Sequence, residues 1–104
     1  MKISLLIFFY LLFTGWHYSL DEAKQIATQE HKYILLNFSG SDWCGPCIRM
    51  HKEIFDDPDF SKMADSQLVM VNADFPRMKK NQLSKEQQKL NNEMAERYNA
   101  KGAF

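Results

Sequence analysis

Two short apolar runs mark the strands that this chain is predicted to form. Tyr33–Phe38 and Leu68–Ala73 are each almost continuously apolar, with a single asparagine as the polar residue in each run. Runs of this length without alternation are typical of strands covered on both faces. The polar residues 39–42 that follow the first run indicate a loop.

Helical spacing of apolar residues predicts two helices that open with a capping box. The first covers Leu20–Lys32, and Ser19 stands three residues before a glutamate. The second opens at Ser84, which stands three residues before a glutamine, and should stop by Gly102. Both helices therefore have a local signal for where they begin.

Helical spacing also resumes after Cys47 and continues from Ile48 to Phe55. Asp57 can cap a helix and Pro58 suits a first helical turn, so a short helix should extend to about Asp65. The resulting order of elements is helix, strand, helix, strand, helix. Strands separated by helical crossovers are expected to be parallel neighbours, so the fold class is α/β.

The first fifteen residues differ from the rest of the chain. Lys2 precedes an apolar run, Ile3–Phe13, and Thr14 and Gly15 end it. A positive start and a short apolar core are typical of a secretory signal, and the run is shorter than the roughly 20 residues of a membrane span. We therefore expect residues 1–15 to be a leader for export, with an uncleaved anchor or a buried element of the domain as alternatives.

Length, composition and charge limit the remaining choices. The chain has 104 residues, 45% of them hydrophobic and 25% charged, which is typical of one small globular domain. The formal net charge is zero and no basic block is interleaved with aromatic residues. Nucleic acid is therefore not expected as a partner, and a membrane only if the leader is retained.

The two cysteines lie together in the run Trp43–Cys47, at the end of the first predicted strand. A pair separated by two residues closes too small a ring to stabilise a fold strongly, but that ring can open and close. Open α/β sheets also place their chemistry at the carboxyl ends of strands. The position and spacing together predict a redox switch.

Each residue of this run has an expected role. Cys44 should meet a helix N-terminus, where free N–H groups favour a thiolate, so it is the expected nucleophile. Cys47, one turn inward and more covered, should resolve the mixed disulfide. Gly45 allows the sulfurs to approach, Pro46 suits a first helical turn, and Trp43 should lie flat beside the sulfurs and offer a surface to a client.

A metal site is the alternative that the residues leave open. Cys44, Cys47 and His51 could supply three ligands, but a second pair of cysteines or a further histidine at zinc spacing does not occur. Covalent haem attachment needs a histidine directly after the second cysteine, where Ile48 stands. No metal and no cofactor are expected.

With these residues in view, the chain resembles the thioredoxin family from roughly Trp16 to Phe104. The resemblance is carried by the motif Trp43–Cys47 after a strand, and the flanks 37–44 and 55–58 are similar to an exported bacterial branch. The resemblance implies a thiol–disulfide oxidoreductase with no bound cofactor, whose electrons cycle through a disulfide between Cys44 and Cys47. It also implies client proteins with disulfides or thiols, an upstream electron donor or acceptor, and a bacterial periplasm or cell envelope. The Gly-Pro pair implies the reducing end of the family's range.

The chain departs from the family pattern at three places. Asn37 stands where the family has a buried aspartate that relays protons, leaving Asp42 or water as substitutes. Lys52 replaces a proline that bends the helix, so a straighter helix is expected. The chain stops at Phe104, where a cis-proline would be expected next.

The expected fold is thus a thioredoxin-like βαβα core with helices flanking a small sheet. This partial domain, residues 16–104, would lack the C-terminal β-hairpin and last helix, as a fragment of a longer protein would. The missing hairpin and Asn37 motivate a second hypothesis, a binding or scaffold module of the same fold with a static disulfide.

Overall fold

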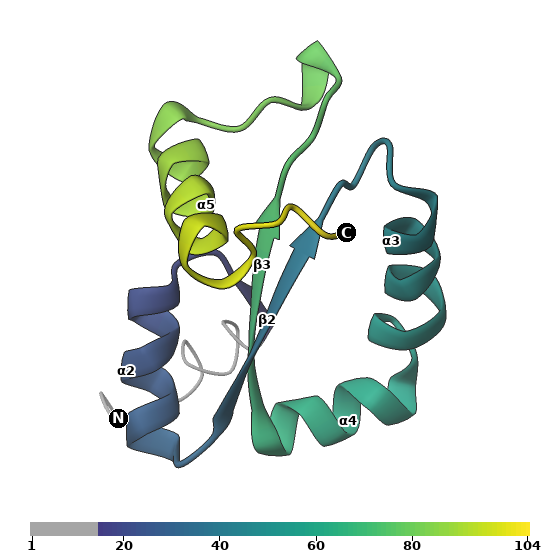
Figure 1. The fold of residues 1–104 in the computed structure, drawn as a ribbon. Helices are drawn as coiled ribbons and strands as arrows, with labels where there is room; N and C mark the ends of the chain where they lie inside the picture. The colour runs from purple at the N-terminus through teal and green to yellow at the C-terminus, as the bar shows by residue number, and fades with distance from the viewer. Residues whose placement is uncertain (1–14) are drawn as a thin grey trace, which may run out of the picture.

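Residues 15–104 are described by a computed structural model, in which three parallel strands form a sheet in the order β1-β3-β2. The strands are β1 (Trp16–His17), β2 (Tyr33–Ser39) and β3 (Leu68–Asp74). Helices α2 and α5 lie on one side of the sheet, and α3 and α4 lie on the other (Figure 1). This arrangement confirms the predicted α/β class and its flanked small sheet.

The helices follow the predicted pattern closely. Their first turns are capped where the sequence indicated, because the side chains of Ser19, Asp57 and Ser84 accept hydrogen bonds from backbone N–H groups of their own helices. The helical elements are α2 (Leu20–Glu30), α3 (Gly45–Met50), η1 (His51–Phe55), α4 (Pro58–Gln67), η2 (Lys79–Asn81) and α5 (Lys85–Tyr98).

Parallel pairing brings the carboxyl ends of β2 and β3 to the same edge of the sheet. The two strands are in register from Tyr33 opposite Leu68 to Ser39 opposite Asp74. The loop that follows β2 and the segment that follows β3 therefore start side by side. This edge of the sheet carries the cysteine pair.

The short strand β1 was not predicted. Trp16 pairs with Met70 and His17 with Val71, on the side of β3 opposite to β2. Two residues are too few to show a period of two, so the pattern of the sequence holds no strand signal there. The addition of β1 makes β3 the central strand among the described residues.

The burial of the two predicted strands differs. β3 is buried along most of its length, with Val71 and Ala73 fully inaccessible, as its apolar run predicts. In β2 the residues are only half-buried and Tyr33 is 82% exposed, so the prediction that both faces are covered is wrong for this strand. The physical reason is its place at the edge of the described sheet, paired with β3 alone.

The core lies between the sheet and its helices and is built largely from small side chains. Alanines of α2 approach the central strand closely, and half-buried apolar residues of β2 complete the packing. The buried cluster consists of Ala23, Ala27, Val69, Val71, Ala73 and Met94. The small alanine side chains let α2 lie close to β3.

The helix after the cysteines is less regular than predicted. The α-helix ends at Met50, and His51–Phe55 form a π-helical turn. Rings of that turn pack on Trp16 of β1, His51 at 6.1 Å and Phe55 at 5.1 Å between centroids. We attribute the wider turn to this packing, because it brings two aromatic side chains to one partner. The helix predicted from the spacing after Cys47 therefore reaches Phe55, with a π-helical turn as its last five residues, and a straighter course at Lys52 stays a prediction.

The apolar run Ile3–Phe13 and most of the predicted leader lie outside the described residues. Within residues 15–104, no helix combines the length and apolar character needed to cross a bilayer. Export and the domain boundary at residue 16 stay predictions.

Candidate active site

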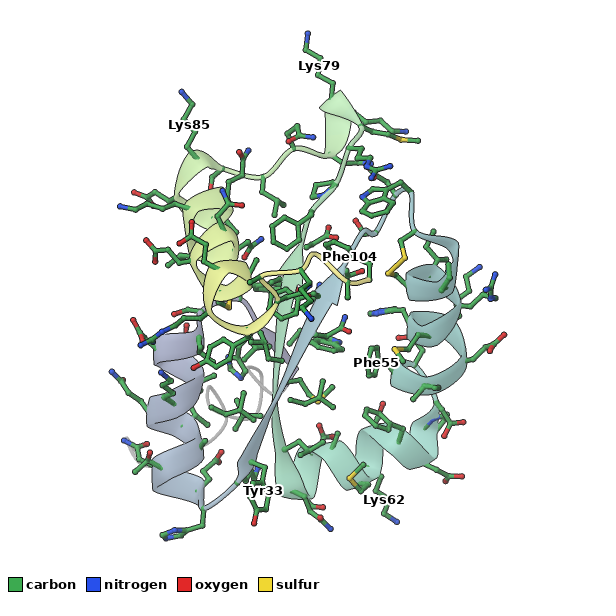
Figure 2. The ribbon with its side chains drawn as sticks, viewed as in Figure 1. Tyr33, Phe55, Lys62, Lys79, Lys85 and Phe104 are labelled. Atoms are coloured by element: carbon green, nitrogen blue, oxygen red, sulfur yellow. A yellow bond between two sulfur atoms is a disulfide. The ribbon has the colours of Figure 1, made fainter. Side chains whose placement is uncertain are left out.

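A disulfide joins Cys44 and Cys47 where β2 gives way to α3. The two Cα atoms are 5.2 Å apart, and Figure 2 shows the sulfur–sulfur bond in yellow at the N-terminal end of α3. Both cysteines of the chain are therefore in one bond, at the carboxyl end of a parallel strand. The structure brings the predicted pair together at the predicted place.

Cys44 caps the helix with its own sulfur. Its backbone is extended, and its Sγ accepts a hydrogen bond from the backbone N–H of Cys47 at 3.3 Å. Pro46 stands in the first turn, where its missing N–H costs nothing. A donor aimed at a sulfur stabilises negative charge on it, so this geometry favours a thiolate at Cys44 once the disulfide is reduced.

The burial of the two cysteines is the reverse of the prediction. Cys44 is only 6% exposed, whereas Cys47 is half-buried. Cys47 lines an open groove of about 780 Å³ together with Asn37 and Phe38 of β2 and Met50 of α3. The groove leaves one side of Cys47 uncovered, which explains why the inner cysteine is the more accessible of the two.

Trp43 is held by partners on several sides. Its indole Nε1 donates to the carbonyl of Phe75 at 2.7 Å, and the guanidinium of Arg77 lies 3.6 Å from the ring centroid. The ring of Phe104 meets it edge-on at 5.3 Å. A Cβ added to Gly40 would lie within 2.6 Å of Trp43 Cζ2. These contacts occupy part of the ring surface that was expected to face a client.

Asp42 ties the cysteine loop to the segment after β3. Its Oδ1 accepts from the backbone N–H of Arg77 at 2.9 Å, and its Oδ2 accepts from the N–H of Met78 at 2.9 Å and from Nδ2 of Asn81 at 3.0 Å. Nothing in the sequence indicated these partners, which lie 35 to 39 residues away. The hydrogen bonds that the carboxylate accepts from other residues all come from the segment after β3, so the structure does not support Asp42 as a proton relay for the cysteines.

The hydrogen bond from Arg77 lowers the pKa of Asp42 below its ordinary value of 3.8, and the bonds from Asn81 and Met78 act in the same direction against the opposing effect of desolvation. A lowered pKa in the folded state means that the carboxylate stabilises the fold above pH 4 or so, and that this stability is lost as the pH falls through the lowered value. We expect the urea midpoints of the wild type and of Asp42→Asn to differ at pH 7 and to converge toward pH 3. A gap between the midpoints that stays constant over this range would contradict the assignment.

Asn37, which stands where the family has a buried aspartate, forms a neutral hydrogen-bonded pair with Asn72. Its Nδ2 donates to Oδ1 of Asn72 at 2.9 Å, across the register of β2 and β3. Neither amide titrates near neutral pH, so this pair holds no proton for Cys47. Among the described side chains, no buried nitrogen or oxygen lacks a hydrogen-bond partner.

The metal alternative finds no support in the geometry. Across residues 15–104, no three histidine, cysteine or acidic side chains come together as metal ligands would. His51 instead stacks on Trp16, and its Nε2 lies 3.4 Å from an oxygen of Asp56. The cysteines are bonded to each other.

Comparison with known proteins places this geometry in context. A family model described as thioredoxin-like matches residues 15–98. The disulfide bond reductase DsbH of Chlamydia pneumoniae is 40% identical over 84 residues, which cover 81% of this chain and 49% of DsbH. The thioredoxin-related protein DsbJ of the same organism is 37% identical over 60 residues, or 58% of this chain and 17% of DsbJ.

A solved structure described as a DsbH oxidoreductase superposes on the chain with a TM-score of 0.76 at 38% sequence identity. The match covers 86% of this chain and 59% of the solved one. The chain thus spans about half the length of the DsbH relative that it matches.

Proposed function

Because the chain belongs to the thioredoxin-like family, we propose that it exchanges disulfides with protein substrates through Cys44 and Cys47. The observation that carries this proposal is the disulfide itself, at the carboxyl end of β2 with the sulfur of Cys44 capping α3. A thiolate there is stabilised by a backbone donor, and its partner sulfur is already within bonding reach. No other described feature of the chain unites a nucleophile and its resolving group in this way.

The proposed reaction has two steps. In the reduced protein the Cys44 thiolate attacks one sulfur of a client disulfide, forms a mixed disulfide and releases the other client sulfur as a thiolate. The Cys47 thiolate then attacks the sulfur of Cys44, which restores the Cys44–Cys47 disulfide and releases the second client thiol. The client gains two electrons, and an upstream dithiol returns two electrons to the pair.

The proton of the Cys47 thiol needs an acceptor before the second step. Asn37 and Asn72 do not titrate, and the carboxylate of Asp42 is engaged by the segment after β3. Cys47 lines the open groove beside β2, so solvent water can reach it and take the proton. Water is therefore the acceptor that the proposal assigns.

The direction and the setting of the reaction are also proposals. DsbH carries the name of a disulfide bond reductase, and the Gly45-Pro46 pair agrees with a reducing role. The leader pattern of residues 1–15 favours export to a bacterial periplasm or envelope. The expected partners are client proteins with disulfides or thiols and a thiol donor upstream.

One observation favours the rival hypothesis, a binding module with a static disulfide. Cys44 is only 6% exposed, so little of the residue is open to a client. A permanently closed ring would need no such access. The two hypotheses differ in whether the disulfide turns over.

Reduction of insulin by dithiothreitol separates the two hypotheses. We expect the wild-type chain to accelerate the precipitation of insulin B chains, because the Cys44–Cys47 pair relays electrons from the reductant. The control is the same chain reduced and alkylated at both cysteines, which should leave the uncatalysed rate. If insulin is reduced at the same rate with the native and the alkylated chain, the oxidoreductase hypothesis is wrong. The binding module with a static disulfide is then the hypothesis that stands.

A further inference from the structure

Two segments from distant parts of the sequence meet beside the redox pair. The active-site loop, residues 40–43, precedes Cys44, and the connector, residues 75–82, follows β3. They start side by side because Ser39 lies opposite Asp74 in the parallel register, and the N–H of Phe75 donates to the carbonyl of Ser39 at 2.8 Å. The connector therefore forms a wall against the loop that precedes the cysteines.

One carboxylate holds most of this wall in place. Asp42 stands in the middle of the active-site loop and accepts three hydrogen bonds from the connector, two from the backbone and one from the side chain of Asn81. All three donors are N–H groups, so an ionised carboxylate with two free oxygens is the group that fits. Arg77, whose N–H is one of the donors, is thereby fixed at its backbone.

Fixing the connector also fixes Trp43. The guanidinium of Arg77 lies 3.6 Å from the centroid of the Trp43 ring, and the carbonyl of Phe75 accepts the indole N–H at 2.7 Å. Both contacts come from the connector and reach the residue directly before Cys44. A cation over an aromatic ring and a half-buried indole hydrogen bond are each orienting interactions.

We propose that Asp42 is a positioning residue of the redox site. Its carboxylate anchors the connector, so that Arg77 and Phe75 hold the Trp43 ring in one orientation beside Cys44. The part of this proposal that concerns turnover rests on the proposed function, whereas the part that concerns Trp43 does not. Asp42 acts on the cysteines through Trp43 and makes no contact with a substrate itself.

Two variants separate the position of the carboxylate from its charge. Asp42→Glu keeps the charge but moves it by one methylene, and Asp42→Asn keeps the length but puts an NH₂ group against N–H donors. The matched control is Asp57→Asn, since Asp57 also accepts two backbone N–H bonds, from Asp59 at 3.1 Å and Phe60 at 3.2 Å, but at the start of α4. All chains carry Trp16→Phe, which leaves Trp43 as the one tryptophan.

We measure insulin reduction and the quenching of Trp43 fluorescence by acrylamide. Both Asp42 variants should slow insulin reduction by about tenfold. A displacement of reacting groups by about 1 Å can slow a reaction by this much or more. Both should raise the quenching constant about twofold, because the loosened wall admits the quencher. Asp57→Asn should leave turnover, quenching and the urea midpoint near the level of the parent, because one asparagine oxygen can accept both bonds and asparagine caps a helix about as well as aspartate.

Four other outcomes would overturn the proposal, and a fifth would test the proposed function instead. If Asp42→Glu shows the same quenching constant and the same turnover as the parent, only the charge of the side chain matters and not its position. Faster turnover in Asp42→Asn, with no change in Asp42→Glu, would lead to the same conclusion. Slower turnover without a change in quenching would mean that Asp42 does not act through Trp43, and equal effects of Asp57→Asn would mean general loosening. If the parent chain itself does not reduce insulin, the proposed function fails, and the quenching comparison still decides the role of Asp42.

Discussion

The Cys47→Ser variant is expected to accumulate a stable mixed disulfide with a client, whereas Cys44→Ser forms none. Without Cys47 the bond between Cys44 and the client can be broken only by an external thiol, so the first step stops at its product. Turnover of insulin should fall to the uncatalysed rate in both variants. The measurement is mass spectrometry, under non-reducing conditions, of each reduced variant mixed with a disulfide-bonded peptide.

The structure gives this experiment two distinct outcomes, because the exposure of the cysteines and the hydrogen bond to Cys44 favour different residues as the nucleophile. Cys47 is the more exposed residue in the structure, while the sulfur of Cys44 accepts the backbone hydrogen bond. If accessibility decides the attack, the adduct will appear in Cys44→Ser instead. That outcome would reverse the proposed roles while leaving thiol–disulfide exchange intact.

Gly40→Ala is expected to lower the free energy of unfolding by about 1–3 kcal/mol, the usual cost of an overpacked site. The added Cβ would lie within 2.6 Å of Cζ2 and Nε1 of Trp43, which leaves no room for the ring in its present place. The ring would have to move, and its hydrogen bond to Phe75 would be lost. Urea denaturation measures the first effect, and the emission maximum of Trp43 in a Trp16→Phe background reports the second.

The matched control for this substitution is Gly45→Ala. A Cβ there meets only Arg49, at 3.7 Å, and the residue begins α3. Alanine in a helix is favoured over glycine by about 0.5–1 kcal/mol, so this variant should keep or raise the urea midpoint. Equal destabilisation by the two substitutions would contradict the argument that the Trp43 ring fills the space beside Gly40.

The elements that the sequence predicted well are those with local signals. The capping residues Ser19 and Ser84 begin their helices as expected, because each bonds an N–H only three residues away. The apolar run of β3 likewise predicts a buried strand, and the structure confirms that the strand is buried over most of its length. The motif 43–47 predicts where the disulfide lies for the same reason: its two ends are close in sequence.

The features that were missed depend on residues far away in the sequence. Strand β1 exists because Trp16 and His17 pair with β3, and two residues carry no period of their own. The π-helical turn packs on Trp16, which the spacing after Cys47 does not encode. Cys44 and Cys47 have a burial order set by the groove beside β2 and not by the motif.

The candidate site also contains features that the sequence predicts and features that it does not. Its disulfide could be predicted from five consecutive residues, whereas the wall beside it could not. The sequence indicates a loop at residues 39–42 and offers Asp42 as a proton relay, but it carries no signal for the bonds of Asp42 to the connector or for Arg77 over the Trp43 ring. The sequence locates the disulfide, and tertiary structure supplies the residues that pack around the loop before it.

The distance along the chain between the cysteines and their wall has a consequence during synthesis. Trp43 bonds a carbonyl 32 residues later, and Asp42 bonds a side chain 39 residues later. At translation rates of about 5–20 residues per second, the two thiols leave the ribosome a few seconds before the segment that packs beside them. In that interval the small ring can already close, because it needs only its own four residues. A nascent chain can therefore be oxidised before the segment that packs beside Trp43 has been made.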